Sequence, residues 1–164
     1  MFGRKRGKKA IFRLVCLVIY HRRFFYDFKS NNQNNSMNIL LIGAVICIIA
    51  LLASAWLMTF AKWFPINGVD EFLPDYKTMI RAHIDYALMA LFNLAFYGLG
   101  IDLPVIACWC VAIGGVANPT IFVIAAFDAN FWNKTHWKVY AALSFIIATI
   151  GFGWIAITLL QHAL

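Results

Sequence analysis

Four long apolar stretches dominate the pattern of hydrophobic and polar positions along this chain. They run from Asn38 to Phe64, Lys77 to Leu99, Leu103 to Phe127 and Trp137 to Gln161. Each has roughly the 20 apolar residues that a helix needs to cross a bilayer. Their hydrophobicity is continuous and does not alternate, which disfavours the strands of a spanning β-barrel. The pattern predicts an all-α fold, a transmembrane four-helix bundle with antiparallel up-down connections.

The overall composition supports a membrane protein. The 164 residues are 63% hydrophobic and only 13% charged, whereas a soluble globular protein carries about 25% charged residues. We therefore predict an integral, multi-pass protein of a bacterial inner membrane or a plasma membrane, with membrane lipid as its surroundings.

The positive charge is concentrated near the N-terminus. Residues 1–36 hold nine Lys or Arg and one acidic residue, whereas residues 37–164 hold five Lys or Arg and six acidic residues. We predict a basic, partly disordered tail over 1–36 and a four-helix transmembrane domain over 37–164. Lys/Arg-rich segments stay cytoplasmic and attract anionic lipid, so we expect a cytoplasmic N-terminus and no nucleic-acid partner. A start at Met37 would remove the tail and leave the orientation open.

Glycine and proline mark the connections and one contact surface. The short segment from Gly98 to Pro104 predicts a tight turn, so the second and third stretches form an antiparallel hairpin. In the last stretch, Gly151 and Gly153 predict a close approach to a neighbouring helix, because glycine has no side chain to hold two helices apart.

Three ionisable residues open the second stretch. Arg81, His83 and Asp85 are costly there, since a charge at the bilayer centre costs about 2.5–3.5 kcal/mol even on the mildest scale. Arg81 and Asp85 are four residues apart and can pair along the helix, so we interpret them mainly as a structural pair. His83 has no partner in its own helix. It is a candidate ligand for haem or another metal, and a hydrogen-bonding role is the alternative.

Helical geometry divides the second stretch into two faces. Because each residue turns the helix by about 100°, one face is expected to look into the bundle and the opposite face to look at lipid. The inward face carries His83, Tyr86, Ala87, Ala90, Asn93, Leu94 and Tyr97. The lipid face carries Leu88, Phe92 and Phe96.

The third stretch carries an amide and a proline near its middle. Asn118 would be an amide in hydrocarbon, which is costly unless it finds a hydrogen-bond partner. Pro119 has no N–H, so the carbonyl of Gly115 loses its helical donor and becomes a free acceptor. His83 on one helix and Asn118 on the next are predicted to face a common site. With one histidine deep enough to ligate, the other side of the metal would stay open for substrate.

These motifs resemble a known family. Arg81-Ala82-His83 opens the second helix, and Ala117-Asn118 lies in the middle of the third. Together with the Gly68–Tyr76 segment they resemble styrene oxide isomerase and the related hydroxylaminobenzene mutases, over roughly residues 63–160. The resemblance implies a homo-oligomer, a trimer in the isomerase, with haem b held between protomers and His83 as the iron ligand. It also implies that Asn118 is a catalytic residue and that a small apolar epoxide is isomerised to a carbonyl compound.

The chain departs from the family at three positions. Phe122 stands where the family has a tyrosine, Met89 where it has an asparagine, and Gly114 where it has an aspartate. Candidate pocket residues are Tyr86, Asn93, Tyr97 and Phe122. These three differences weaken the prediction of epoxide isomerisation more than they weaken the prediction of haem binding. The alternative to an isomerase is therefore a non-catalytic membrane scaffold, or a haem-binding protein without isomerase activity.

Overall fold

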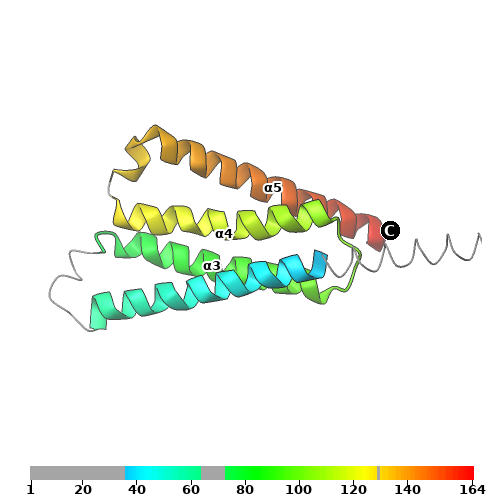
Figure 1. Cartoon of the computed structure of the whole chain (residues 1–164), viewed down its shortest axis with the longest axis horizontal. Coiled ribbons are helices and arrows are strands. Elements are labelled where there is room, and N and C mark those ends of the chain that lie inside the picture. The colour runs from blue at the N-terminus through cyan, green and yellow to red at the C-terminus, as the bar shows by residue number, and fades with distance from the viewer. Residues whose placement is uncertain (1–35, 64–72, 129) are drawn as a thin grey trace, which may run out of the picture. The chain divides into compact units, whose positions relative to one another are not determined.

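The computed structural model describes residues 36–63, 73–128 and 130–164, which form four long helices (Figure 1). The Ser36–Trp63 helix is followed by α3 (Tyr76–Gly98), α4 (Val105–Phe127), the short 3-10 helix η1 (Phe131–Asn133) and α5 (Thr135–Ala163). The long helices pack antiparallel, up and down. The predicted all-α bundle is confirmed, and each helix end lies within two residues of its expected position.

The four long helices belong to one compact unit, Ser36–Leu164, which forms the helical bundle. The expectations for the basic tail and for its cytoplasmic location concern residues outside the described part of the chain.

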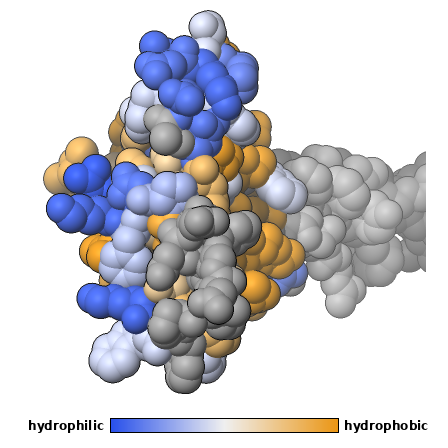
Figure 2. Space-filling model, turned by 90° about the vertical axis from the view of Figure 1, so that its left-hand side faces the viewer, coloured by the Kyte–Doolittle hydropathy of each residue, from blue (hydrophilic) through white to orange (hydrophobic). Residues whose placement is uncertain are grey.

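Three of the long helices are long and apolar enough to cross a membrane. They are the Ser36–Trp63 helix, α4 and α5. Helix α3 has 23 residues but is not among the three, and it carries Lys77, Arg81 and Asp85. In Figure 2, which looks onto the end that carries the 128–134 connection, hydrophilic residues gather at this end and hydrophobic ones cover the sides.

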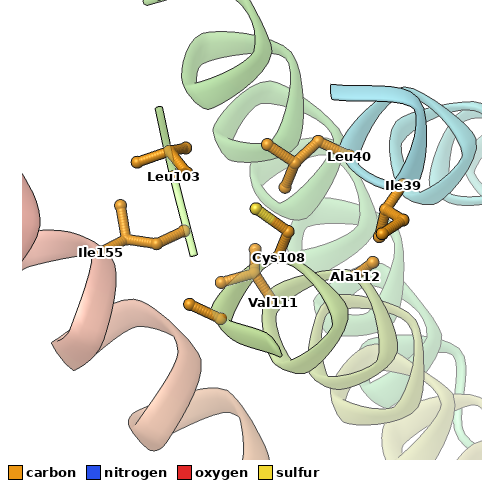
Figure 3. Packing of buried hydrophobic residues seen from close by; sticks show 8 residues of the cluster. Ile39, Leu40, Leu103, Cys108, Val111, Ala112 and Ile155 are labelled. Carbon is orange, nitrogen blue, oxygen red and sulfur yellow. The ribbon is translucent and has the colours of Figure 1, made fainter. Parts of the chain in front are cut away.

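Helix α4 lies at the centre of the bundle, since it packs against both α3 and α5. One cluster of buried residues joins it to the start of the first helix and to the second half of α5 (Figure 3). Its members are Ile39, Leu40, Leu103, Ala107, Cys108, Val111, Ala112 and Ile155. In lipid, such packing stabilises a bundle through close contact between side chains, because lipid tails are as apolar as the side chains themselves.

Glycines set the closest helix contacts. A Cβ built on Gly114 of α4 would lie 2.8 Å from Ala148 Cα, and one on Gly151 of α5 would lie 2.7 Å from the Val111 backbone nitrogen. Both helices therefore approach with backbone against backbone. The prediction for Gly151 is confirmed, whereas no atom of the described residues lies within 4 Å of a Cβ built on Gly153.

The helix ends follow the expected turn chemistry. Helix α3 ends at Gly98, and Gly100 adopts a φ of 64°, the left-handed conformation that glycine tolerates best. Pro104 then caps the start of α4. At the other end of α3, the Asp75 carboxylate accepts hydrogen bonds from the Thr78 backbone N–H and hydroxyl. This is an N-cap, which satisfies a donor that the first turn of a helix leaves without a partner.

Candidate functional site

His83 is held by a hydroxyl from another helix. The side chain is half-buried, and its Nδ1 lies 3.0 Å from the Oγ of Ser54 on the Ser36–Trp63 helix. Ser54 is itself buried and donates its own hydroxyl proton to the carbonyl of Leu51 at 2.8 Å. A serine hydroxyl has one proton, so this network assigns the Nδ1–H of His83 as the donor to Ser54. The lone pair of Nε2 is then free, which is the tautomer of a metal-binding imidazole.

Arg81 and Asp85 do not form the predicted pair in the described part of the chain. Arg81 is exposed and Asp85 is half-buried, and the one ion pair recorded between described residues joins Lys134 to Asp128. The i, i+4 spacing makes a pair geometrically available, but the side chains do not use it. His83 is therefore the residue of this trio with a specific partner.

Tyr86 links α3 to α4 through its hydroxyl. The side chain is buried, and its oxygen lies 2.8 Å from the Oγ1 of Thr120. Thr120 donates its own proton to the carbonyl of Val116 at 2.7 Å, so Tyr86 is the donor to Thr120. Tyr86 and Ser54 also line a cavity of about 200 Å³ between the first helix, α3 and α4.

Asn93 lies where three helices meet. It is fully buried, and its Nδ2 donates to the carbonyl of Met89 at 2.8 Å. Its Oδ1 has no hydrogen-bond partner among the described residues. A Cβ built on Gly43 of the first helix would lie 3.0 Å from this oxygen, and one on Gly115 of α4 would lie 3.3 Å from Nδ2. The amide thus fills the junction between two glycines.

Asn118 is half-buried in the middle of α4. Its Oδ1 is buried and lacks a hydrogen-bond partner among the described residues. The register in which Gly114 meets Ala148 brings Ser144, one helical turn earlier on α5, to the level of Asn118. Ser144 donates its proton to the carbonyl of Ala141. Ser144 therefore does not supply the hydrogen-bond donor that the buried Asn118 oxygen needs.

The other candidate pocket residues lie apart. Tyr97 is 39% exposed, and the half-buried Phe122 packs against a cluster near the start of α3 that contains Met79 and Ala82. No hydrogen bond between described residues joins His83 to Asn118, and neither residue lines the cavity beside Ser54 or the larger one along α4. A common site of these residues stays a prediction.

The inward face of α3 is only partly as predicted. Its buried residues are Met79, Ala82, Tyr86, Ala90 and Asn93, so the predicted burial of Tyr86, Ala90 and Asn93 is confirmed. Leu94 and Tyr97 are exposed instead. The lipid-facing assignment of Phe96 is wrong, because Phe96 packs against the central cluster and lies 5.9 Å, between ring centroids, from Phe152 of α5.

The larger cavity lies on another side of α4. It has a volume of about 500 Å³ and is formed by the Ser36–Trp63 helix, α4 and Tyr140 of α5. Neither this cavity nor the hydroxyls of Ser54, Thr120 and Tyr140 were predicted from the sequence. The available signal was a polar side chain inside each apolar stretch.

Within the described residues, no group of three or more His, Cys, Asp or Glu side chains is arranged to hold a metal ion. His83 is therefore not part of such a group among the described residues. Comparison of the chain with protein-family models, curated proteins and solved structures gives no match.

Proposed function

We propose that this chain is a membrane haem protein that ligates the iron of haem b through His83. The observation that carries the proposal is the contact between Ser54 Oγ and His83 Nδ1 at 3.0 Å. Because Ser54 gives its own proton to Leu51, it accepts the proton on Nδ1 and leaves Nε2 as a lone-pair donor. Histidines that bind metals are oriented by this kind of second hydrogen bond.

The surroundings of His83 agree with a group held at the side of the bundle. The cavity beside Ser54 has a volume of about 200 Å³, which is below the roughly 300–1,000 Å³ of ligand pockets. One protomer therefore does not enclose a porphyrin there. His83 is half-buried, so part of its ring is accessible from outside. This supports a homo-oligomer in which a second copy covers the haem, as the resemblance implies.

The proposed chemistry is isomerisation of a small apolar epoxide to a carbonyl compound. When bound, a ferric haem would supply a Lewis acid for the epoxide oxygen. The chain's own residues would orient the imidazole through Ser54 and keep water away through the apolar surface of α3, where Ile80 and Ile84 are exposed. Phe122 offers no hydroxyl, and Tyr86 already donates to Thr120. Haem binding and turnover are therefore separate parts of the proposal.

An absorption spectrum of the full chain, purified in detergent and supplied with haem, tests the first part. We expect a Soret band that is lost in His83→Ala and retained in His136→Ala, which changes an exposed histidine at the start of α5. Ser54→Ala should keep the band but weaken haem affinity by about 10- to 100-fold, the usual effect of removing such a supporting hydrogen bond. A colourless wild-type protein, or a band unchanged in His83→Ala, would refute haem ligation by His83.

A non-catalytic scaffold is the second candidate, and the same contact favours it. The Ser54–His83 hydrogen bond joins two helices, and such bonds stabilise membrane bundles by about 0.6 kcal/mol on average. This candidate predicts a colourless protein in which Ser54→Ala and His83→Ala lower the unfolding temperature by similar amounts. Under the haem proposal, added haem raises the unfolding temperature of the wild type and leaves that of His83→Ala unchanged.

A further inference from the structure

The 500 Å³ cavity between the Ser36–Trp63 helix, α4 and α5 has the size of a ligand site. We call this cavity the α4 groove. Its lining residues are Ile39, Ile42, Gly43, Ile46, Trp109, Ala112, Ile113, Val116, Ala117, Thr120 and Tyr140. Neither His83 nor Ser54 is among them, so binding of a ligand in the α4 groove does not depend on haem binding.

The rim of the α4 groove is apolar and open. Ile42, Ile46, Trp109 and Ile113 are exposed, and they belong to the first helix and α4, two of the helices that are apolar enough to cross a membrane. The opening therefore lies between membrane-facing surfaces. A ligand would reach it from the lipid phase and would need a hydrocarbon body to match the walls.

Two hydroxyls supply the polar part of the inner lining, and both have already used their protons. Tyr140 donates to the carbonyl of Ala117 at 3.2 Å, and Thr120 donates to the carbonyl of Val116 at 2.7 Å. Each hydroxyl oxygen has two lone pairs. Thr120 accepts one bond from Tyr86 and keeps one lone pair, whereas no described donor occupies the oxygen of Tyr140. Both hydroxyls thus present acceptors to the groove, and the side-chain donor of the lining is the indole N–H of Trp109 at the exposed rim.

From this pattern we infer that the α4 groove binds an apolar alcohol or phenol that enters from the membrane. The hydrocarbon part lies against the isoleucines and Trp109, and the ligand hydroxyl donates to Tyr140 or Thr120. An ether or ketone with the same body carries only acceptors, so it cannot bond to either hydroxyl while these donate to Ala117 and Val116. A lipid acyl chain fills the walls equally well but gains nothing from the two hydroxyls.

A matched pair of brominated probes tests this inference on the full chain in detergent. The probes are 4-bromophenol and 4-bromoanisole, which differ in the donor hydroxyl, and bromine quenches the fluorescence of a nearby tryptophan. Trp109 lines the groove and is the reporter. After correction for the measured partition of each probe into micelles, we expect saturable quenching with the phenol binding roughly 2- to 12-fold more tightly, as one neutral hydrogen bond gives. Trp109→Phe should reduce the saturable quenching, and Trp137, whose ring centroid lies 6.1 Å from that of Tyr140, reports the remainder.

Substitutions then separate hydrogen bonding from simple occupancy. Tyr140→Phe should weaken the phenol toward the affinity of the anisole, whereas Tyr97→Phe, outside the groove, should leave the preference intact. Ile113→Phe narrows the groove at an exposed rim position and should weaken both probes alike, which provides a test that does not depend on Tyr140. Equal affinity for the two probes, or no saturable quenching in the wild type, would overturn the inference.

Discussion

Cys47 Sγ lies 3.7 Å from the carbonyl oxygen of Gly115, and the thiol donates to it from the first helix to α4. This carbonyl is the one that Pro119, four residues later, leaves without its helical N–H donor. The sequence predicted the free acceptor, and the structure shows which side chain takes it. Cys47 thus joins the first helix to α4 through a hydrogen bond.

Replacing Cys47 should reveal this hydrogen bond. We expect Cys47→Ala to unfold at a lower temperature in detergent than the wild type, because alanine cannot donate to the Gly115 carbonyl. The difference should be about 0.6 kcal/mol, and at most about 1.7 kcal/mol. Cys110→Ala provides the control on α4, and an equal loss there would argue against the Gly115 bond.

Gly151 should tolerate no larger residue. In Gly151→Ala the new Cβ would lie 2.7 Å from the Val111 nitrogen, a backbone atom that cannot turn away. Overpacking of this kind costs roughly 1–3 kcal/mol, so we expect a clearly lower unfolding temperature. Gly153→Ala is the matched control, since a Cβ built there meets no atom within 4 Å. If both variants unfolded at the same temperature, the backbone contact between α4 and α5 would be refuted.

Asn93 should be replaceable by leucine without loss of stability. Its Oδ1 is buried and has no partner among the described residues, and an unsatisfied buried group costs about 1–3 kcal/mol. Leucine has a similar branched shape and no polar atom. We therefore expect the unfolding temperature of Asn93→Leu to equal or exceed that of the wild type, with Asn93→Ala lower because it leaves a cavity. A lower unfolding temperature for Asn93→Leu than for the wild type would contradict a net cost of the unpartnered oxygen.

Asp75 should make the start of α3 sensitive to acid. The Thr78 hydroxyl and backbone N–H stabilise the carboxylate and lower the pKa of Asp75 below its ordinary value of 3.8. Since the folded pKa is the lower one, the stabilisation is complete above the ordinary pKa and is lost as the pH falls through the folded pKa. The wild type should lose more stability over this range than Asp75→Asn, which still caps the helix but does not titrate. If the stabilities of the wild type and Asp75→Asn fell in parallel as the pH decreased, the hydrogen bonds from Thr78 to the Asp75 carboxylate would be contradicted. The effect is small, because the carboxylate is exposed.

The helices were predictable because twenty consecutive apolar residues leave a membrane chain few alternatives. The contacts between them were not. His83 contacts Ser54 on a helix that precedes it by 29 positions, and this depends on how the two helices are rotated and aligned, which the periodicity of one helix does not fix. The same holds for Gly151 and Gly153: both are glycines in the same helix, but they point about 200° apart, and the register alone decides which one meets α4.

The α4 groove also could not be predicted from the sequence. It combines residues from three helices, and none of these residues is unusual in its own stretch. Conversely, the predicted common site of His83 and Asn118 rested on facing positions in a hairpin. Because Gly114, one turn earlier, packs against Ala148, the helical register alone places Asn118 on the side of α4 that faces α5.

The short turn between Gly98 and Pro104 has a consequence for biosynthesis. Helix α3 is less apolar than its three neighbours and carries three charged residues in its first ten, so it gains little by entering a bilayer alone. The turn ties it directly to α4, which is apolar enough to cross. We expect the two helices to insert together, with Tyr86 and Asn93 already sheltered against α4. Lengthening this turn should therefore impair membrane insertion more than lengthening the 128–134 connection.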